Sequence, residues 1–409
     1  MGSSLSKSFA AMLVLIFLTA SCLIVLLPVT AESQTIVVPD DYLTISSAIG
    51  NATAGNTVFV KKGTYEGPID QTLVIDKALS LVGEDTNNTI LILHPAYTEW
   101  WILTQPYISY SNAISVDAND FKLSGFSIST QGSIAIKGDR TQITGNKIAT
   151  GISVTGSNCN ITGNAIDGVI ILEGSSNVLN QNSVSGIALK YAYSNTITNN
   201  TFAYLNFGSV SDTNYTCSYN IISRNRIEGD WNWGIWLGAG SHNVFYENHI
   251  ANYRGYDGWG VALGFGTNGT HNSLVGTNNT FYHNIFTNNN KNVYDSWNNL
   301  TAPNFWDNDE EGNYWDDYNG TDDNRDGIGD TPYVINGDNI DYYPLMEPFD
   351  VESDAVVLPS PESFPATLVV VVPGVSVVVI GVALLVYFKK HHPKLEVKRW
   401  GKALFWYLF

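Results

Sequence analysis

Apolar and polar positions alternate in short stretches through the middle of the chain, and one short pattern recurs many times. Each copy has an apolar residue at its third place, Asn at its sixth and another apolar residue at its eighth. Seven copies share this pattern and begin at Thr141, Cys159, Asn177, Asn195, Asn220, Asn243 and Asn279. Two short strands joined at a fixed corner in every copy predict a chain that coils once per repeat.

The sixth-place Asn residues recur 18 residues apart three times, and then 25, 23 and 36 residues apart. We expect each of them to occupy a left-handed or bridging corner and to bond to the coils above and below, which makes an Asn ladder. Its members are Asn146, Asn164, Asn182, Asn200, Asn225, Asn248 and Asn284.

A third apolar strand opens each coil, as in Gly151-Ile-Ser-Val and Gly234-Ile-Trp-Leu. Three parallel strands per coil predict an all-β fold, the right-handed parallel β-helix, which is a solenoid. The alternative, a β-sandwich with repetitive turns, gives no reason to keep Asn at one place through seven copies. Residues Thr44 to Ala52 predict a short N-terminal capping helix, with Thr44 as N-cap.

The two ends of the chain are apolar and predict export and anchoring. Lys7 and an apolar run favour a signal peptide, with an uncleaved anchor as the alternative. A second apolar run is long enough to span a bilayer and precedes a basic tail, which puts the C-terminus in the cytoplasm. The expected segments are a signal peptide at 1–31, an ectodomain at 32–350 with an acidic cap at about 305–347, a linker at 351–365, a transmembrane helix at 366–388 and a cytoplasmic tail at 389–409.

The composition narrows the classes of partner. The formal net charge of the whole chain is −18. Because the basic tail contributes positive charge to this total, the net charge of the ectodomain alone is more negative. A nucleic-acid partner is therefore not expected. Cys159 and Cys217 lie three coil steps apart, which is too far for a disulfide, and we expect both thiols to be free, with Cys217 the more reactive one. Asn-x-Thr sites, for example at Asn214, Asn268 and Asn319, predict a glycoprotein.

Segments at both ends of the repeat carry a family resemblance. The run VFVKKGTYEG resembles the opening of pectin-lyase-like β-helix proteins. Gly312-Asn-Tyr-Trp315, Gly327-Ile-Gly-Asp330 and Ile340-Asp-Tyr-Tyr-Pro344 resemble the NosD-type family of surface and periplasmic proteins. The resemblance implies a right-handed parallel β-helix, and the family's label implies copper, although the ectodomain's His residues are not clustered.

The acidic cap contains a loop with the spacing of a calcium site. Oxygen-bearing side chains stand at positions one, three, five and nine, a backbone carbonyl can serve position seven, and Gly327 makes the sharp turn. Tyr333 replaces the Glu that normally completes such a loop. A solvated acidic turn is the alternative. The expected ligands are Asp322, Asn324, Asp326, Ile328 and Asp330.

Three successive coils have longer corners, at Ala203–Phe207, Glu228–Trp233 and Ala251–Trp259. Stacking places these corners side by side and brings aromatic rings next to charged groups. Such a surface suits the apolar faces and hydroxyls of sugars, although we expect about half of the rings to pack against the coils. The expected carbohydrate contacts are Trp231, Trp233, Trp259, Tyr253, Tyr256, Asp230, Arg254 and Asp257.

These features predict a single-pass cell-surface protein, with its ectodomain outside and its C-terminus in the cytoplasm. It is expected to bind cell-envelope glycans, surface proteins or metal ions without catalysis. The alternative is a membrane-tethered polysaccharide lyase, hydrolase or epimerase on the same fold. Titratable residues on the outer columns, such as Arg224, Glu247 and His249, fit either catalytic groups or surface ion pairs.

Overall fold

A computed structural model describes the central part of the chain, which falls within one compact unit. The described residues are 33–102, 105–208, 217–230, 232–238, 240–255, 258–264, 276–295 and 303–349. Within them, no helix combines the length and the apolar character that crossing a membrane requires. The expected signal peptide and transmembrane helix lie outside the described residues.

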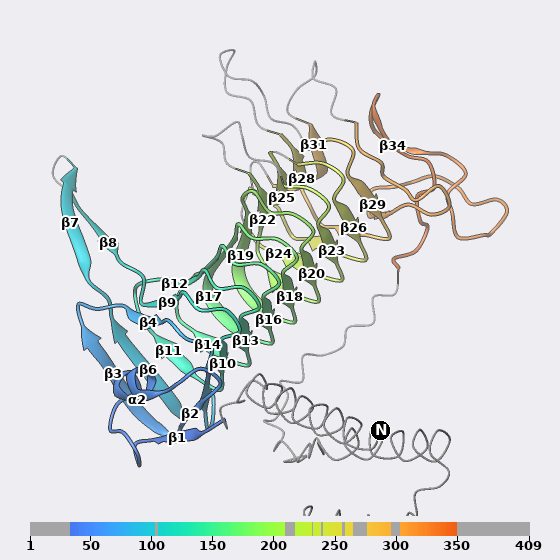
Figure 1. The fold of residues 1–409 in the computed structure, drawn as a ribbon. Helices are drawn as coiled ribbons and strands as arrows, with labels where there is room; N and C mark the ends of the chain where they lie inside the picture. Colours follow the sequence, from blue (N-terminus) through green and yellow to red (C-terminus); the bar gives the residue numbers. More distant parts are fainter. Residues whose placement is uncertain are drawn as a thin grey trace, which may run out of the picture. The chain divides into compact units, whose positions relative to one another are not determined.

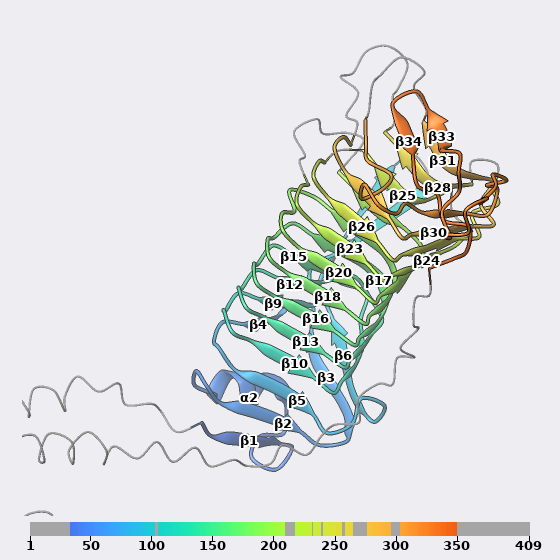
Figure 2. The same ribbon diagram turned by 90° about the vertical axis from the view of Figure 1, so that its right-hand side faces the viewer.

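The described residues form a parallel β-helix, in which coil after coil stacks along one axis (Figures 1 and 2). One face is an 11-stranded parallel sheet. Its strands, in order, are β1 (Thr35–Val38), β2 (Thr57–Val60), β5 (Ser80–Gly83), β10 (Lys122–Ser124), β13 (Gln142–Thr144), β16 (Asn160–Thr162), β18 (Val178–Asn180), β20 (Thr196–Thr198), β23 (Ile221–Ser223), β26 (Val244–Tyr246) and β29 (Thr280–Tyr282).

The other two faces join into a 19-stranded sheet, because two of its strands continue around the corner between them. The second face holds β3 (Gly63–Ile69), β6 (Thr89–His94), β11 (Ser127–Ser129), β14 (Lys147–Ile148), β17 (Ala165–Leu172), β19 (Ser183–Leu189), β21 (Thr201–Phe202), β24 (Arg226–Glu228), β27 (His249–Ala251), β30 (Ile285–Thr287) and β32 (Tyr314–Trp315). The third face holds β4 (Leu73–Ile75), β9 (Ile114–Val116), β12 (Ile134–Ile136), β15 (Ile152–Val154), the ends of β17 and β19, β22 (Leu205–Phe207), β25 (Trp233–Leu237), β28 (Trp259–Leu263) and β31 (Lys291–Asp295).

The predicted apolar places point into a continuous core. Leu123, Ile143, Ile161, Leu179 and Ile197 pair in register on successive strands, and all are buried. Burying a side chain of this size contributes about 1.5–3 kcal/mol. The alternation of inward apolar and outward polar residues therefore fixes the register from coil to coil.

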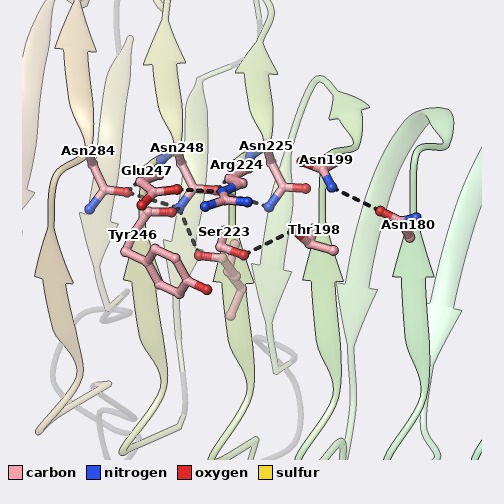
Figure 3. Close-up of polar contacts among 11 residues, drawn as sticks. Asn180, Thr198, Asn199, Ser223, Arg224, Asn225, Tyr246, Glu247, Asn248 and Asn284 are labelled. Carbon is pink, nitrogen blue, oxygen red and sulfur yellow. Dashed lines mark hydrogen bonds and ion pairs between the residues drawn. The ribbon is translucent and has the colours of Figure 1, made fainter. Parts of the chain in front are cut away.

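The predicted Asn ladder is present, and its members are buried. In several rungs an Asn Oδ1 accepts both the backbone N–H and the side-chain amide of the Asn one coil earlier. Asn225, for example, donates to Asn248 Oδ1 from its backbone N at 3.0 Å and from Nδ2 at 2.9 Å. Asn248 repeats both bonds with Asn284 (Figure 3). Each side chain thus satisfies buried donors on two coils, and every coil is bonded to the next at the same corner.

The backbone conformation of the corner differs from the expectation. The ladder Asn residues themselves are not left-handed; the residue before each of them is. That place is Gly145 (φ 63°) and Gly163 (φ 66°) in two coils and non-glycine in the others, including Arg224 (φ 54°) and Glu247 (φ 54°). The left-handed residue turns the chain, so the following Asn can point inward along the axis.

A second ladder runs along the first place of the pattern and was not predicted. Asn177, Asn195, Asn220, Asn243 and Asn279 are buried there, and each backbone N–H donates to the next Asn Oδ1. Cys159 heads this row, because its backbone N donates to Asn177 Oδ1 at 2.7 Å. The recurring first-place Asn was visible in the sequence. Its role went unnoticed because two copies have Thr or Cys at that place.

Both ends of the core are covered. The helix α2 (Ile45–Asn51), capped by Thr44 as predicted, packs against β1, β2 and β3 with Ile45, Ala48 and Ile49 buried. At the other end, two fully buried indoles close the stack, with Trp306 on Phe281 and Trp315 on Phe286. Two antiparallel hairpins complete the described residues: β7 (Tyr97–Ile102) with β8 (Gln105–Tyr110), and β33 (Tyr333–Asn336) with β34 (Asn339–Asp341).

The two described cysteines are free, as expected from their separation along the axis. Both are buried, and burial raises the pKa of each thiol. The expectation that Cys217 is the more reactive thiol is therefore wrong. Cys217 is part of the core, and its carbonyl accepts a 2.9 Å bond from Asn243 Nδ2 in the second ladder.

Candidate functional site

The predicted carbohydrate contacts do not all come together. Trp233 and Trp259 are register partners on β25 and β28, and both are half-buried. Asp230 and Arg254 are exposed on their corners. Tyr253 is fully buried and supports the corner rather than facing a ligand. The other three candidates, Trp231, Tyr256 and Asp257, lie outside the described residues.

Trp233 and Trp259 belong to a larger group of aromatic side chains, the aromatic wall, which comprises Trp233, Trp236, Trp259 and Tyr294. Trp236 and Tyr294 stand in one outward column, separated by Ala262, which leaves room between the larger rings. Trp259 stacks on Tyr294 with 3.7 Å between ring centroids and 8° between planes. The ring centroids of Trp233 and Trp236 are 6.3 Å apart.

Glycine residues let these rings and their supports approach the backbone. A Cβ on Gly234 would lie 2.7 Å from the Tyr253 ring, and one on Gly260 would lie 2.6 Å from the Asn292 carbonyl oxygen. The Tyr253 hydroxyl donates to the Ala203 carbonyl at 2.6 Å, which ties the third long corner to the first. The corners are therefore held by packing and hydrogen bonds, so the wall is preorganised.

The polar groups of the wall are unevenly satisfied. Trp233 Nε1 donates to Asn206 Oδ1 at 3.0 Å. Trp236 is 6% exposed, and its buried Nε1 has no hydrogen-bond partner among the described residues. At the far end Lys291 Nζ lies 5.3 Å from the centre of the Tyr294 ring, within range of a cation–π contact. The wall thus combines the half-buried rings of Trp233, Trp259 and Tyr294 with the buried ring of Trp236.

The outward alternation of the strands contained the signal for the two wall residues that the sequence analysis missed. Ile235 and Leu237 point into the core, so Trp236 between them has to point outward. Tyr294 follows the inward Val293 in the same way. It was overlooked because its strand belongs to a coil that lacks the Asn pattern.

The charged outer columns form local ion pairs. Arg224 Nε bonds to Glu247 Oε2 at 2.5 Å (Figure 3), and His283, at the same place of the next coil, pairs with Glu311. Arg226 Nη2 lies 2.8 Å from Glu228 Oε2. Exposed pairs of this kind contribute little to stability, with a typical value of about 0–1 kcal/mol.

The predicted calcium loop is ordered by its own carboxylates. Both oxygens of Asp322 accept backbone N–H groups, including those of Arg325 and Gly327 at 2.6 Å and 2.9 Å. Asn324 Nδ2 donates to Asp326 Oδ2 at 2.9 Å, and Gly327 has φ 89°. These bonds bend the loop in the way that the motif predicts.

Metal ligands do not converge in the part of the chain that the structure describes, where no three His, Cys, Asp or Glu side chains form a group able to hold an ion. The described His residues stand apart: His94 pairs with Glu66, and His242 stacks on Tyr219 at 5.2 Å. His271 lies outside the described residues. Calcium and copper binding therefore rest on the sequence alone.

Comparison with known proteins agrees with the fold. A search of curated proteins found no match. Among solved structures, the Dettilon tailspike protein is 15% identical with a TM-score of 0.43, and the match covers 62% of each chain. A mannuronic-acid-specific family 6 polysaccharide lyase from human gut microbiota is 12% identical with a TM-score of 0.41, over 69% of this chain and 86% of that one. The catalytic domain of an α-1,3-glucanase in complex with nigerose is 13% identical with a TM-score of 0.38, over 70% of each chain.

Likenesses at this level say nothing about activity. The family comparison is more direct, because it matches the sequence of the repeats themselves. Residues 148–309, which hold six of the seven ladder Asn residues and all three long corners, match the model of the right-handed β-helix region.

Proposed function

We propose that the protein binds glycans at the cell envelope through the aromatic wall, without cleaving the glycan chain. The observation that carries this proposal is the pair of half-buried indoles, Trp233 and Trp259, fixed on neighbouring coils. Because the β-helix already holds both rings, binding a ligand costs little additional ordering of the protein.

The chemistry of the wall fits a sugar. The C–H face of a pyranose packs on an indole ring, and its hydroxyls need both donors and acceptors. The exposed Asp230 and Arg254, on the adjoining corners, supply an acceptor and a donor. The formal net charge of −18 disfavours a polyanionic nucleic acid as the ligand.

The placement in the cell is part of the same proposal and rests on the sequence. A signal peptide at 1–31 exports the chain, and a helix at 366–388 anchors it, with the basic tail at 389–409 in the cytoplasm. The wall then faces the envelope outside the membrane. The resemblance to the NosD-type family is compatible with this location.

A glycan array probed with the full-length protein in detergent tests the proposal. We expect retention of a subset of glycans, and replacing both Trp233 and Trp259 with Ala should weaken it by about tenfold or more, because two stacking surfaces are lost. Tyr219→Ala is the matched control, since Tyr219 is an aromatic residue with 61% exposure that lies outside the wall.

Equal retention by the wild type and the double variant, with unchanged melting temperatures, would contradict the proposal. The retained glycans should also be recovered and assayed for new reducing ends and for unsaturated products. Conversion would favour the alternative function, a membrane-tethered polysaccharide lyase or hydrolase. A change in sugar configuration would favour an epimerase.

A further inference from the structure

Three polar side chains from successive coils meet on the outer face of β24, β27 and β30. His249 stands in the middle. Its Nε2 lies 2.8 Å from Thr287 Oγ1, and its Nδ1 faces Glu228 Oε1 at 3.5 Å. The second Glu228 oxygen is held by Arg226 at 2.8 Å. A carboxylate, an imidazole and a hydroxyl therefore lie in sequence across three coils.

The register explains how His249 reaches both neighbours. Ala251 pairs with Glu228 on one side and with Thr287 on the other. Its methyl group leaves room for the imidazole of His249, which starts two residues earlier on the same strand. The side chain of His249 is 32% exposed and Thr287 is half-buried, so a ligand can approach the hydroxyl from solvent.

One atom of this group is not explained by a surface ion pair. Glu228 Oε1 is buried and has no hydrogen-bond partner within the part of the chain that the structure describes. The nearby Tyr253 hydroxyl does not donate to Glu228 Oε1, because it donates to the Ala203 carbonyl instead. The group that faces Oε1 is His249 Nδ1, and catalytic hydrogen bonds of this kind are often long before a substrate binds.

We propose that Glu228, His249 and Thr287 form a catalytic site that hydrolyses carboxylic esters, the class that includes O-acyl groups on hydroxyl-rich ligands. A hydroxyl, a base and a carboxylate that orients the base are the parts that acyl transfer requires. The site goes beyond glycan binding and does not depend on the aromatic wall.

The reaction has two steps. In the first, Thr287 Oγ1 bonds to the acyl carbon while His249 Nε2 takes the hydroxyl proton; the ester C–O bond then breaks, and the departing alcohol takes that proton from His249. In the second, His249 removes a proton from water, which attacks the acyl-threonine. The carboxylic acid leaves, and Thr287 regains its proton. Glu228 stabilises the imidazolium formed in each step.

The protonation state of His249 suits this role. Burial lowers the pKa of His249, Glu228 opposes the shift, and Arg226 adds to it. The imidazole is therefore neutral at pH 7, and Nε2 can accept a proton. Activity should fall as the pH drops through the lowered pKa, below the ordinary value of 6.5.

The test uses the full-length protein in detergent and a fluorophosphonate probe, which bonds to hydroxyls that a neighbouring base activates. Peptide mapping should place the label on Thr287. His249→Gln and Thr287→Val should abolish labelling, and Thr287→Ser should preserve it. Thr201→Val is the matched control, because Thr201 is an outward Thr on the same face that pairs with Arg226 rather than with a His.

Hydrolysis of p-nitrophenyl acetate gives a second measurement. We expect His249→Gln and Thr287→Val to lower the rate by about 100-fold, and Thr201→Val to leave it unchanged. If wild-type Thr287 remains unlabelled in the folded protein, or if His249→Gln labels equally well, the proposal is overturned. Glycan retention by the same variants is measured separately, so failure of the ester site leaves the proposed binding function standing.

Discussion

At the scale of single residues, buried side-chain amides form hydrogen bonds between coils at corners that the strands do not reach. Asn200 Oδ1 accepts two bonds from Asn182, and Asn200 Nδ2 donates to the Leu179 and Thr198 carbonyls and to Asn225 Oδ1. One side chain therefore satisfies groups on three coils. An apolar side chain of similar size could fill the space but could not satisfy any of these groups.

Removing a ladder side chain should be costly. Asn182→Ala or Asn200→Ala leaves buried donors and acceptors unpaired, at about 1–3 kcal/mol for each unsatisfied group. Denaturant unfolding should show the loss, whereas Asn180→Ala, on the outer face of the same coil, should change stability much less. Two ladder variants that melt like the wild type would contradict the role given to the ladder.

Asp341 stands where the first ladder ends and makes the cap sensitive to pH. Its Oδ2 accepts bonds from Asn313 N and Trp315 Nε1, both at 2.8 Å, and Oδ1 accepts one from Tyr343 N. Burial nevertheless raises the pKa of Asp341 to about 6, from 3.8. The stability that the protonated form contributes is therefore fully present below pH 3.8 and is lost as the pH rises through about 6.

Asp341→Asn should remove this part of the pH dependence, because the amide does not titrate. We expect the difference in melting temperature between pH 5 and pH 7.5 to change in this variant. Asp338→Asn, an exposed neighbour, should keep the wild-type difference. The same pH profile in wild type and Asp341→Asn would show that Asp341 does not control the cap.

At the scale of elements, the acidic loop between β32 and β33 is the best candidate for a ligand-dependent segment. Calcium at 100 times its dissociation constant should stabilise the folded state by about 2.7 kcal/mol. Asp326→Ala should abolish the rise in melting temperature, and Asp323→Ala, at a position that the motif does not use, should retain it. Identical melting curves in chelator and in excess calcium would leave the loop as a solvated turn.

The sequence predicted elements well where the pattern repeats and poorly where it breaks. In each copy of the pattern, the inward Ile and Leu residues and the sixth-place Asn specify one corner and the two strands beside it. The periodicity therefore predicted the strands between β13 and β29. The left-handed residue before each ladder Asn was missed, because Arg224 and Glu247 do not favour that conformation and adopt it only under the constraint of stacking. The Glu228–His249–Thr287 group was missed because it depends on the register between coils of unequal length.

At the scale of the molecule, stability and function occupy different parts of each coil. The ladders and the core hold the corners and inner faces, and the aromatic wall and the Glu228 group lie on outer faces. Each coil mainly contacts its neighbours, so the loss of one outer side chain is not transmitted far along the axis. Variants of the wall and of the ester site can therefore be combined and should act independently.

The unequal coil lengths have a consequence for how such a protein can diversify. The rungs join residues 18 positions apart at Asn182–Asn200, 25 at Asn200–Asn225 and 36 at Asn248–Asn284, yet the bonds are the same. Since a rung fixes only the two residues that it joins, the chain between them can lengthen at a small entropic cost. New recognition loops can thus be inserted or exchanged while the frame stays constant.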